Sequence, residues 1–181
     1  MESRVKLFGH PIHPMLIVLP LGLLSAAVVF DVVHLVTDDE VFSSIAFWNI
    51  ALGVVGGLLA AVFGLIDWLN IPKETRARRI GLFHGLGNVI VVTLFAVSWV
   101  IRLAASTYEP GTIGYVFSFA GIGLALVTGW LGGELVDRLG VGVDHGANLD
   151  APNSLTGVPA DSRAQRPSHT GVFAGRPRSK P

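Results

Sequence analysis

The chain of 181 residues contains no cysteine. Disulfides, zinc sites with cysteine ligands and iron–sulfur clusters all depend on cysteine sulfur, so this chain can supply none of them. A haem attached covalently at a Cys-x-x-Cys-His motif is excluded for the same reason. Any metal or haem that the chain holds must therefore be bound through groups other than thiolates.

Familiar catalytic and ligand-binding motifs are missing as well. The sequence has no phosphate-binding glycine loop, no Gly-x-Ser-x-Gly nucleophile motif, no His-Glu-x-x-His zinc motif and no patch of basic and aromatic residues. We therefore expect no contact with nucleic acid, and whether the protein is an enzyme is left open.

Charged residues are scarce, at 14% of the chain against about 25% in ordinary soluble domains. Four stretches contain no Asp, Glu, Lys or Arg, and each is long enough to cross a hydrocarbon core, which takes roughly 20 residues. They are Leu7 to Phe30, Val41 to Ile66, Ile80 to Ile101 and Pro110 to Gly133. The helices of a soluble bundle would carry a polar stripe, and these stretches have none. The sequence predicts an integral membrane protein.

The predicted fold is all-α, a four-helix transmembrane bundle with up-down-up-down order in residues 1–139. The expected helices are about 12–36, 43–70, 80–104 and 112–137, and short linkers make consecutive helices antiparallel neighbours. Pro20 lies inside the first helix and is expected to kink it. We read the first helix as an uncleaved span and not as a signal peptide.

Cations are distributed unevenly between the two sides of the predicted bundle. The side with the N-terminus, the 72–79 loop and the region after the fourth helix receives twelve of the thirteen Lys and Arg residues, and the other side receives Arg102 alone. Because cationic loops stay in the cytoplasm, both termini are predicted to be cytoplasmic, in a multi-pass protein of the inner (cytoplasmic) membrane of the cell.

Residues 140–181 are rich in Gly, Pro, Ser, Asn and Arg and contain few large apolar side chains. Such a segment cannot bury enough surface to fold by itself, so we expect a polar, disordered cytoplasmic tail. Its basic end, Arg176 to Lys180, is a candidate for contact with anionic lipid, although a solvated tail with no partner is the simpler interpretation.

Polar residues inside the spans fall into two layers. His13 and Asp31 are 18 residues apart, as are His84 and Arg102, and 18 residues make about five helical turns. The first and third helices run in the same direction, so the two histidines are expected at one level and Asp31 and Arg102 at the other. A buried Asp31–Arg102 ion pair, with His34 nearby, is the simplest structural interpretation; a proton or ion path is the alternative.

The cytoplasmic layer is predicted to gather polar residues from all four helices. We expect His10, His13, Asp67, His84 and Glu134 to converge near one end of the bundle. Histidines and carboxylates that face inward are the groups with which helix bundles hold metals and haem. His13 and His84 are the favoured ligands and His10 a weaker one. Asp67 and Glu134 are expected to bind a metal directly or to orient the imidazoles. The alternative is that all five merely meet water at the interface.

Three stretches of the sequence resemble an uncharacterised bacterial membrane family, the domain of unknown function 2231. They are Gly9-His10-Pro11-Ile12-His13-Pro14, Gly64-Leu65-Ile66-Asp67-Trp68, and Gly132-Gly133-Glu134-Leu135-Val136 with Gly140-Val141-Gly142-Val143. The resemblance covers about residues 5–145 and implies four helices. Some members are joined to Rieske or cytochrome c domains, which implies a redox setting. Where members commonly carry Tyr and then His, this chain has Asp137 and Leu139.

Together these features favour a membrane protein that binds b-type haem or a transition metal near its cytoplasmic face and takes part in electron transfer, with redox proteins as partners. One alternative is a small proton or ion transporter component; another is a structural or assembly subunit. Glycines at helix-packing spacing would also permit homo-oligomers.

Overall fold

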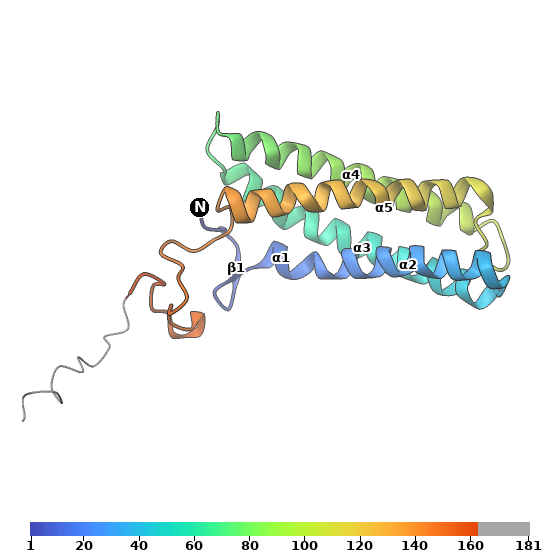
Figure 1. The fold of residues 1–181 in the computed structure, drawn as a ribbon, viewed down its shortest axis with the longest axis horizontal. Coiled ribbons are helices and arrows are strands. Elements are labelled where there is room, and N and C mark those ends of the chain that lie inside the picture. Colours follow the sequence, from blue (N-terminus) through green and yellow to red (C-terminus); the bar gives the residue numbers. More distant parts are fainter. Residues whose placement is uncertain (163–181) are drawn as a thin grey trace, which may run out of the picture.

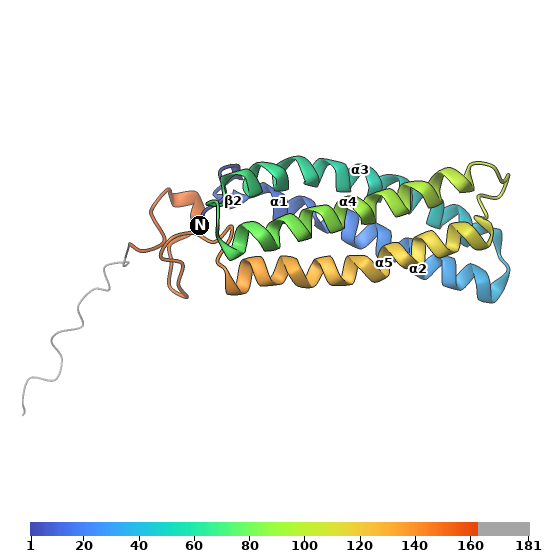
Figure 2. The same cartoon turned by 90° about the horizontal axis from the view of Figure 1, so that it is seen from above.

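The computed structural model describes residues 1–162, and residues 163–181 lie outside this description. Four long helical segments run up, down, up and down along one axis (Figures 1 and 2). In chain order the elements are β1 Lys6–Leu7, β2 His10–Pro11, α1 Ile12–Leu16, α2 Val18–Thr37, α3 Glu40–Asn70, α4 Arg76–Arg102, α5 Gly111–Gly133, the π-helix η1 Glu134–Arg138 and the 3₁₀-helix η2 Ser154–Thr156. The predicted fold class is confirmed.

The first span is broken between α1 and α2. Proline has no backbone N–H, so Pro20 cannot donate to the carbonyl of Leu16 as an ordinary residue would. α1 accordingly ends at Leu16, and α2 begins at Val18. The two pieces still form one continuous helical span from Ile12 to Thr37.

Helix caps move two of the predicted boundaries toward the N-terminus. The side chain of Asp39 accepts from Val41 N at 3.0 Å, so α3 begins at Glu40 and not at residue 43. Thr75 accepts from Arg78 N at 3.1 Å, so α4 begins at Arg76 and not at residue 80. Arg76, Arg78 and Arg79, which the sequence places in the 72–79 loop, therefore lie in the first turns of α4.

Arg78 closes the turn between α3 and α4. Its guanidinium donates to the carbonyl of Trp68 and, at 3.2 Å, to that of Ile71, and it lies 3.7 Å from the centroid of the Trp68 ring. Trp68 Nε1 donates in return to the carbonyl of Arg78 at 3.0 Å. These bonds satisfy carbonyls that the end of α3 leaves free.

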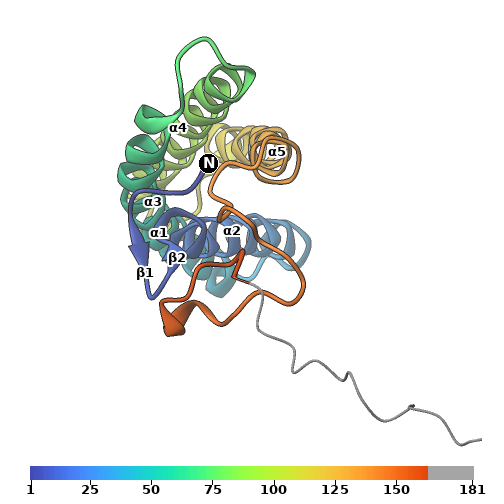
Figure 3. The same cartoon turned by 90° about the vertical axis from the view of Figure 1, so that its left-hand side faces the viewer.

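The four spans surround a small core formed by α2, α3 and α4. Its buried members are Leu24, Ala27, Ala46, Ile50, Val91 and Phe95. The end view in Figure 3 shows α3 and α5 on opposite sides of the bundle. Many large apolar side chains face outward instead, for example Leu126, which is 73% exposed. A bundle in water would bury such residues, whereas lipid tails solvate them. Each of the four helical segments is long and apolar enough to span a membrane.

Residues 1–10 and 140–161 contact each other at the end of the bundle that holds the N-terminus (Figure 1). We call this end the N-terminal end and the end with residues 103–110 the opposite end. Lys6 Nζ lies 2.9 Å from Glu2 Oε2 and 2.5 Å from Asp144 Oδ1, and His145 N donates to Glu2 Oε1 at 3.0 Å. Ser154 Oγ donates to the carbonyl of Phe8 at 3.2 Å.

These contacts form what we call the clasp, which the sequence analysis did not anticipate. The described part of the predicted tail, residues 140–162, forms turns and one short 3₁₀-helix. It has no apolar core of its own, and residues of the N-terminal segment supply its polar partners. The basic stretch Arg176 to Lys180 lies outside the described residues.

Candidate functional site

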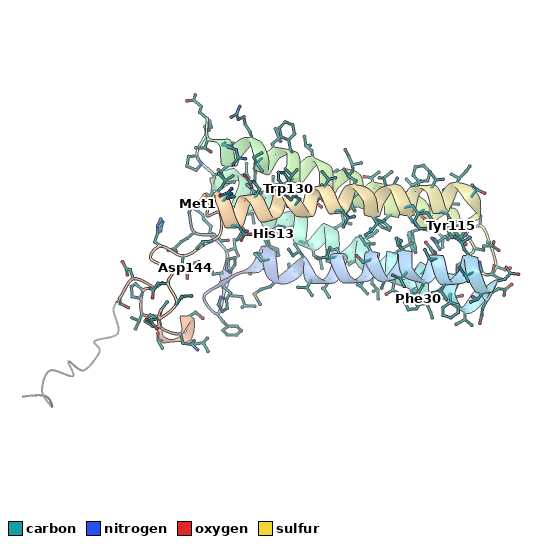
Figure 4. All side chains as sticks on the ribbon, viewed as in Figure 1. Met1, His13, Phe30, Tyr115, Trp130 and Asp144 are labelled. Atoms are coloured by element: carbon teal, nitrogen blue, oxygen red, sulfur yellow. The ribbon has the colours of Figure 1, made fainter. Side chains whose placement is uncertain are left out.

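His13 and His84 meet inside the bundle near the N-terminal end. His13 belongs to α1 and His84 to α4, and their ring centroids lie 6.5 Å apart with the ring planes at 89°. The label in Figure 4 marks the position of His13 between the helices at this end. Helical register thus places the two imidazoles together, although the first span is broken between α1 and α2.

Each imidazole is oriented by a backbone carbonyl on the antiparallel neighbouring helix. His13 Nδ1 lies 2.9 Å from the carbonyl oxygen of Ala60, and His84 Nδ1 lies 2.9 Å from that of Thr128. A carbonyl oxygen can only accept, so Nδ1 carries the proton in both rings. A neutral ring of this kind keeps Nε2 unprotonated, with a lone pair that can bind a metal.

A glycine makes room for each ring one helical turn after the carbonyl that holds it. A Cβ atom at Gly64 would lie 2.8 Å from His13 Cε1, and one at Gly132 would lie 3.1 Å from His84 Cε1. Neither position tolerates a larger residue unless the ring moves. These glycines therefore belong to the histidine site as well as to helix packing.

The two sites repeat within the chain. His84 follows His13 by 71 residues and Arg102 follows Asp31 by 71, and in each half the glycine stands four residues after the carbonyl that binds the imidazole. In each half, therefore, a histidine on one helix meets a carbonyl and a glycine on the next helix, and the two histidines correspond to each other.

The second half adds a side-chain support that the first half lacks. Asn88 Nδ2 donates to the carbonyl of His84 at 2.9 Å, and its Oδ1 accepts from Thr128 Oγ1 at 3.0 Å. Nδ2 lies 3.4 Å and 3.2 Å from the two ring nitrogens of His84. An atom so nearly equidistant from both lies against the face of the ring, which leaves the in-plane lone pair of Nε2 free.

The structure does not bring the other predicted ligands to this pair. His10 lies in the β1–β2 hairpin, where its Nε2 is 3.4 Å from Ser154 Oγ. Asp67 accepts from Ser3 Oγ at 2.5 Å, and Glu134 pairs with Arg76 at 2.6 Å. Within residues 1–162 no three His, Asp or Glu side chains form a metal-type group.

Helix geometry explains why the two carboxylates lie apart from the imidazoles. His13 is level with Ala60, and Asp67 lies seven residues further along α3, which is about 10 Å nearer the end. Glu134 likewise follows Thr128, which is level with His84, by six residues. The sequence thus predicts at which end of the bundle Asp67 and Glu134 lie, but not how far they are from the imidazoles along the bundle axis.

At the opposite end, Asp31 and Arg102 form a fully buried ion pair between α2 and α4. Arg102 Nη1 donates to Asp31 Oδ1 at 2.9 Å and Nη2 to Oδ2 at 2.6 Å. Ser98 and Ser118 bond each other at 2.8 Å beside the guanidinium. His34 Nδ1 lies 2.9 Å from the carbonyl of Asp39. Each charge therefore has its opposite charge, and the guanidinium has the two serine hydroxyls as further partners.

Sequence reasoning missed the residues that support these pairs. Asn88 stands four residues after His84 on the same helix face, a spacing that could have indicated its role. Ser98 stands four residues before Arg102 on α4, and Arg102 Nε donates to its hydroxyl at 3.4 Å, so the same spacing could have indicated its role. Thr128 and Ser118 carry no such signal, because the side chains that they contact lie on α4 and they themselves lie on α5. Two hollows on the described surface lie elsewhere, one along the outer face of α3 and one within the clasp.

The chain was compared with known proteins. Residues 9–145 match a family described as predicted membrane protein (DUF2231). No curated protein and no solved structure matches the chain at a significant level. The match covers both imidazoles, the buried ion pair and all four spans, and the chain therefore belongs to this family of predicted membrane proteins.

Proposed function

We propose that His13 and His84 are the axial ligands of a b-type haem and that the protein transfers electrons within the membrane. The observation that carries this proposal is the pairing of two imidazoles whose ring centroids lie 6.5 Å apart, each with Nδ1 held by a carbonyl. If haem were bound here, His13 and His84 would hold its iron through Nε2, the ring nitrogen that the carbonyl bonds leave available.

The hydrogen bonds that the two rings make to carbonyls also support a metal centre. Histidines that bind metals usually donate their other N–H to a carboxylate or a backbone carbonyl, which fixes the tautomer and the ring orientation. Ala60 and Thr128 supply such carbonyls here.

The donor set favours haem iron over a bare metal ion. A bare transition metal in a protein usually needs three or four protein ligands, whereas haem brings four nitrogens and needs two axial ligands. The described residues provide two imidazoles and no third His, Asp or Glu beside them. Bound haem would supply one-electron redox chemistry, and the chain would supply the axial ligands, their orientation and an apolar setting.

We also propose that the N-terminal end lies in the cytoplasm and that the membrane is the bacterial inner membrane. Lys73, Arg76 and Arg79 stand at or near the start of α4 at this end. The opposite end presents Asp38, Asp39 and Glu40, and the one cation that residues 1–162 place there, Arg102, is paired inside the bundle with Asp31. Redox partners would then reach the site from the cytoplasmic side.

The proposal is tested by the absorption spectrum of the protein purified in mild detergent from cells supplied with haem precursors and iron. The expected result is a Soret band with about one haem per chain. His13→Ala and His84→Ala are each expected to abolish the band while the helices stay inserted. His10→Ala is the matched control, because His10 lies in the hairpin beside Ser154 and should leave the band unchanged.

Other results would contradict the proposal. Colourless wild-type protein from such cells would exclude haem, and stoichiometric iron, copper or zinc in that sample would point to a bare metal instead. A sample without haem or metal that dissipates a proton gradient in liposomes would favour transport.

A further inference from the structure

A second feature lies on the outer face of α3, away from the histidine site. Six residues form a shallow groove there, Val41, Ser44, Ile45, Trp48, Asn49 and Leu52. Their spacing of three and four residues places them along one stripe of the helix. Trp48 is 58% exposed and Leu52 57%, so the stripe faces the lipid. We call it the α3 groove.

The α3 groove contains two polar side chains that have no hydrogen-bond partner among residues 1–162. They are the hydroxyl of Ser44 and the carboxamide of Asn49. Neighbouring polar residues of the spans differ in this respect: Ser43 donates to the carbonyls of Glu40 and Thr107, and Thr93 donates to that of Val89. Two further polar atoms of the spans, Trp99 Nε1 and Tyr115 OH, also lack a partner, but these are buried inside the bundle, whereas Ser44 and Asn49 lie on the outer face of α3.

The depth of Asn49 makes its unpaired amide costly. Asn49 stands nine residues after Glu40, the first residue of α3, which is about 13 Å along the helix axis. At that depth it lies in the hydrocarbon region, where neither water nor lipid tails can hydrogen-bond with it. Such an amide is stabilised by polar groups of another helix.

We propose that the α3 groove is a homodimer interface in which the Asn49 side chains of two copies hydrogen-bond to each other. All copies of a membrane protein share one orientation, so a two-fold axis along the membrane normal brings identical residues to the same depth. A carboxamide is both donor and acceptor, so Asn49 is complementary to itself. Ser44 meets Ser44 by the same symmetry, and Trp48 and Leu52 pack around the polar contact.

The first test uses the absence of cysteine from the chain. Val41→Cys introduces a single thiol at the end of the groove near the membrane surface, and mild oxidation in vesicles should join two chains through it. Ile113→Cys is the control, since Ile113 is 65% exposed on α5, which lies across the bundle from α3 (Figure 3). Cross-linking of Ile113→Cys that is as fast as that of Val41→Cys would overturn the proposal.

The second test measures dimerisation of the full chain by energy transfer between labelled copies as the protein is diluted in liposomes. Asn49→Leu should weaken the dimer about 10-fold. Thr93→Val is the matched control, because the hydroxyl of Thr93 is already satisfied by its own helix and the change should leave dimerisation unaltered. Wild-type protein that remains monomeric at high density, or a dimer that Asn49→Leu leaves equally strong, would refute the assignment.

Discussion

Asp31 and Arg102 carry opposite charges, and both side chains are completely buried. A charge in the centre of a bilayer costs about 2.5–3.5 kcal/mol or more. The two residues tolerate burial because their hydrogen bonds are bidentate and because Ser118 also accepts from the guanidinium at 3.4 Å. Either charge without its partner would be unstable in lipid. The ion pair therefore also specifies which positions of α2 and α4 lie at the same level.

Removal of one partner of this pair is expected to destabilise the bundle strongly. Asp31→Asn or Arg102→Leu alone should lower the free energy of unfolding by about 3–5 kcal/mol, because each change leaves the charge of the other residue buried without a partner. The double variant should lose less than the sum of the two single changes. Thermal unfolding of the four proteins in one detergent measures this, and additive losses would count against the pair.

At the scale of secondary-structure elements, the N-terminal segment with the β1–β2 hairpin and the segment after η1 stabilise each other through the contacts of the clasp. The backbone N–H of His145 and then the side chain of Lys6 hold the pKa of Glu2 below its usual value. Asp144 and then Glu2 raise the pKa of Lys6. Because the pKa of Glu2 is lowered, the stabilisation that Glu2 contributes is lost as the pH falls through that pKa. Because the pKa of Lys6 is raised, the stabilisation that Lys6 contributes is lost as the pH rises through that pKa. The clasp is therefore most stable between these limits.

Acid is accordingly expected to open the clasp. With pyrene labels on Phe8→Cys and Leu155→Cys, excimer fluorescence should be high near neutral pH and should fall as the pH drops through the lowered pKa of Glu2. In the Lys6→Gln variant the excimer signal should already be weak at neutral pH. Excimer emission that stays constant down to pH 3 would contradict this account.

For the whole molecule, the proposed orientation predicts the location of each loop. A reporter that is active only outside the cytoplasm should be active when fused after Glu40 or Glu109 and inactive when fused after Lys73. The expectation follows from the cations at the start of α4, since cationic loops remain in the cytoplasm. Activity of the Lys73 fusion would reverse the orientation and would move the histidine pair to the other side of the membrane.

Sequence alone determined the membrane character, the number of spans and their order. Long runs without charge can satisfy their backbone in lipid only as helices, so these features follow from local composition. The shared level of His13 and His84, and that of Asp31 and Arg102, also follows from the sequence, because a five-turn spacing is a property of the helix itself. The break between α1 and α2 lies at Ile17, three residues before Pro20, and follows from the kink that a proline inside a helix predicts.

Tertiary structure decided which polar groups meet. Asp67 pairs with Ser3, and Glu134 with Arg76, because a carboxylate near a helix end binds the closest donor, and that donor comes from another part of the chain. The support of His84 by Asn88 and Thr128 depends on how far α4 and α5 slide past each other, which periodicity does not specify. Contacts between residues 1–10 and 140–161 join the two ends of the described chain, and no local pattern encodes a partner at that distance.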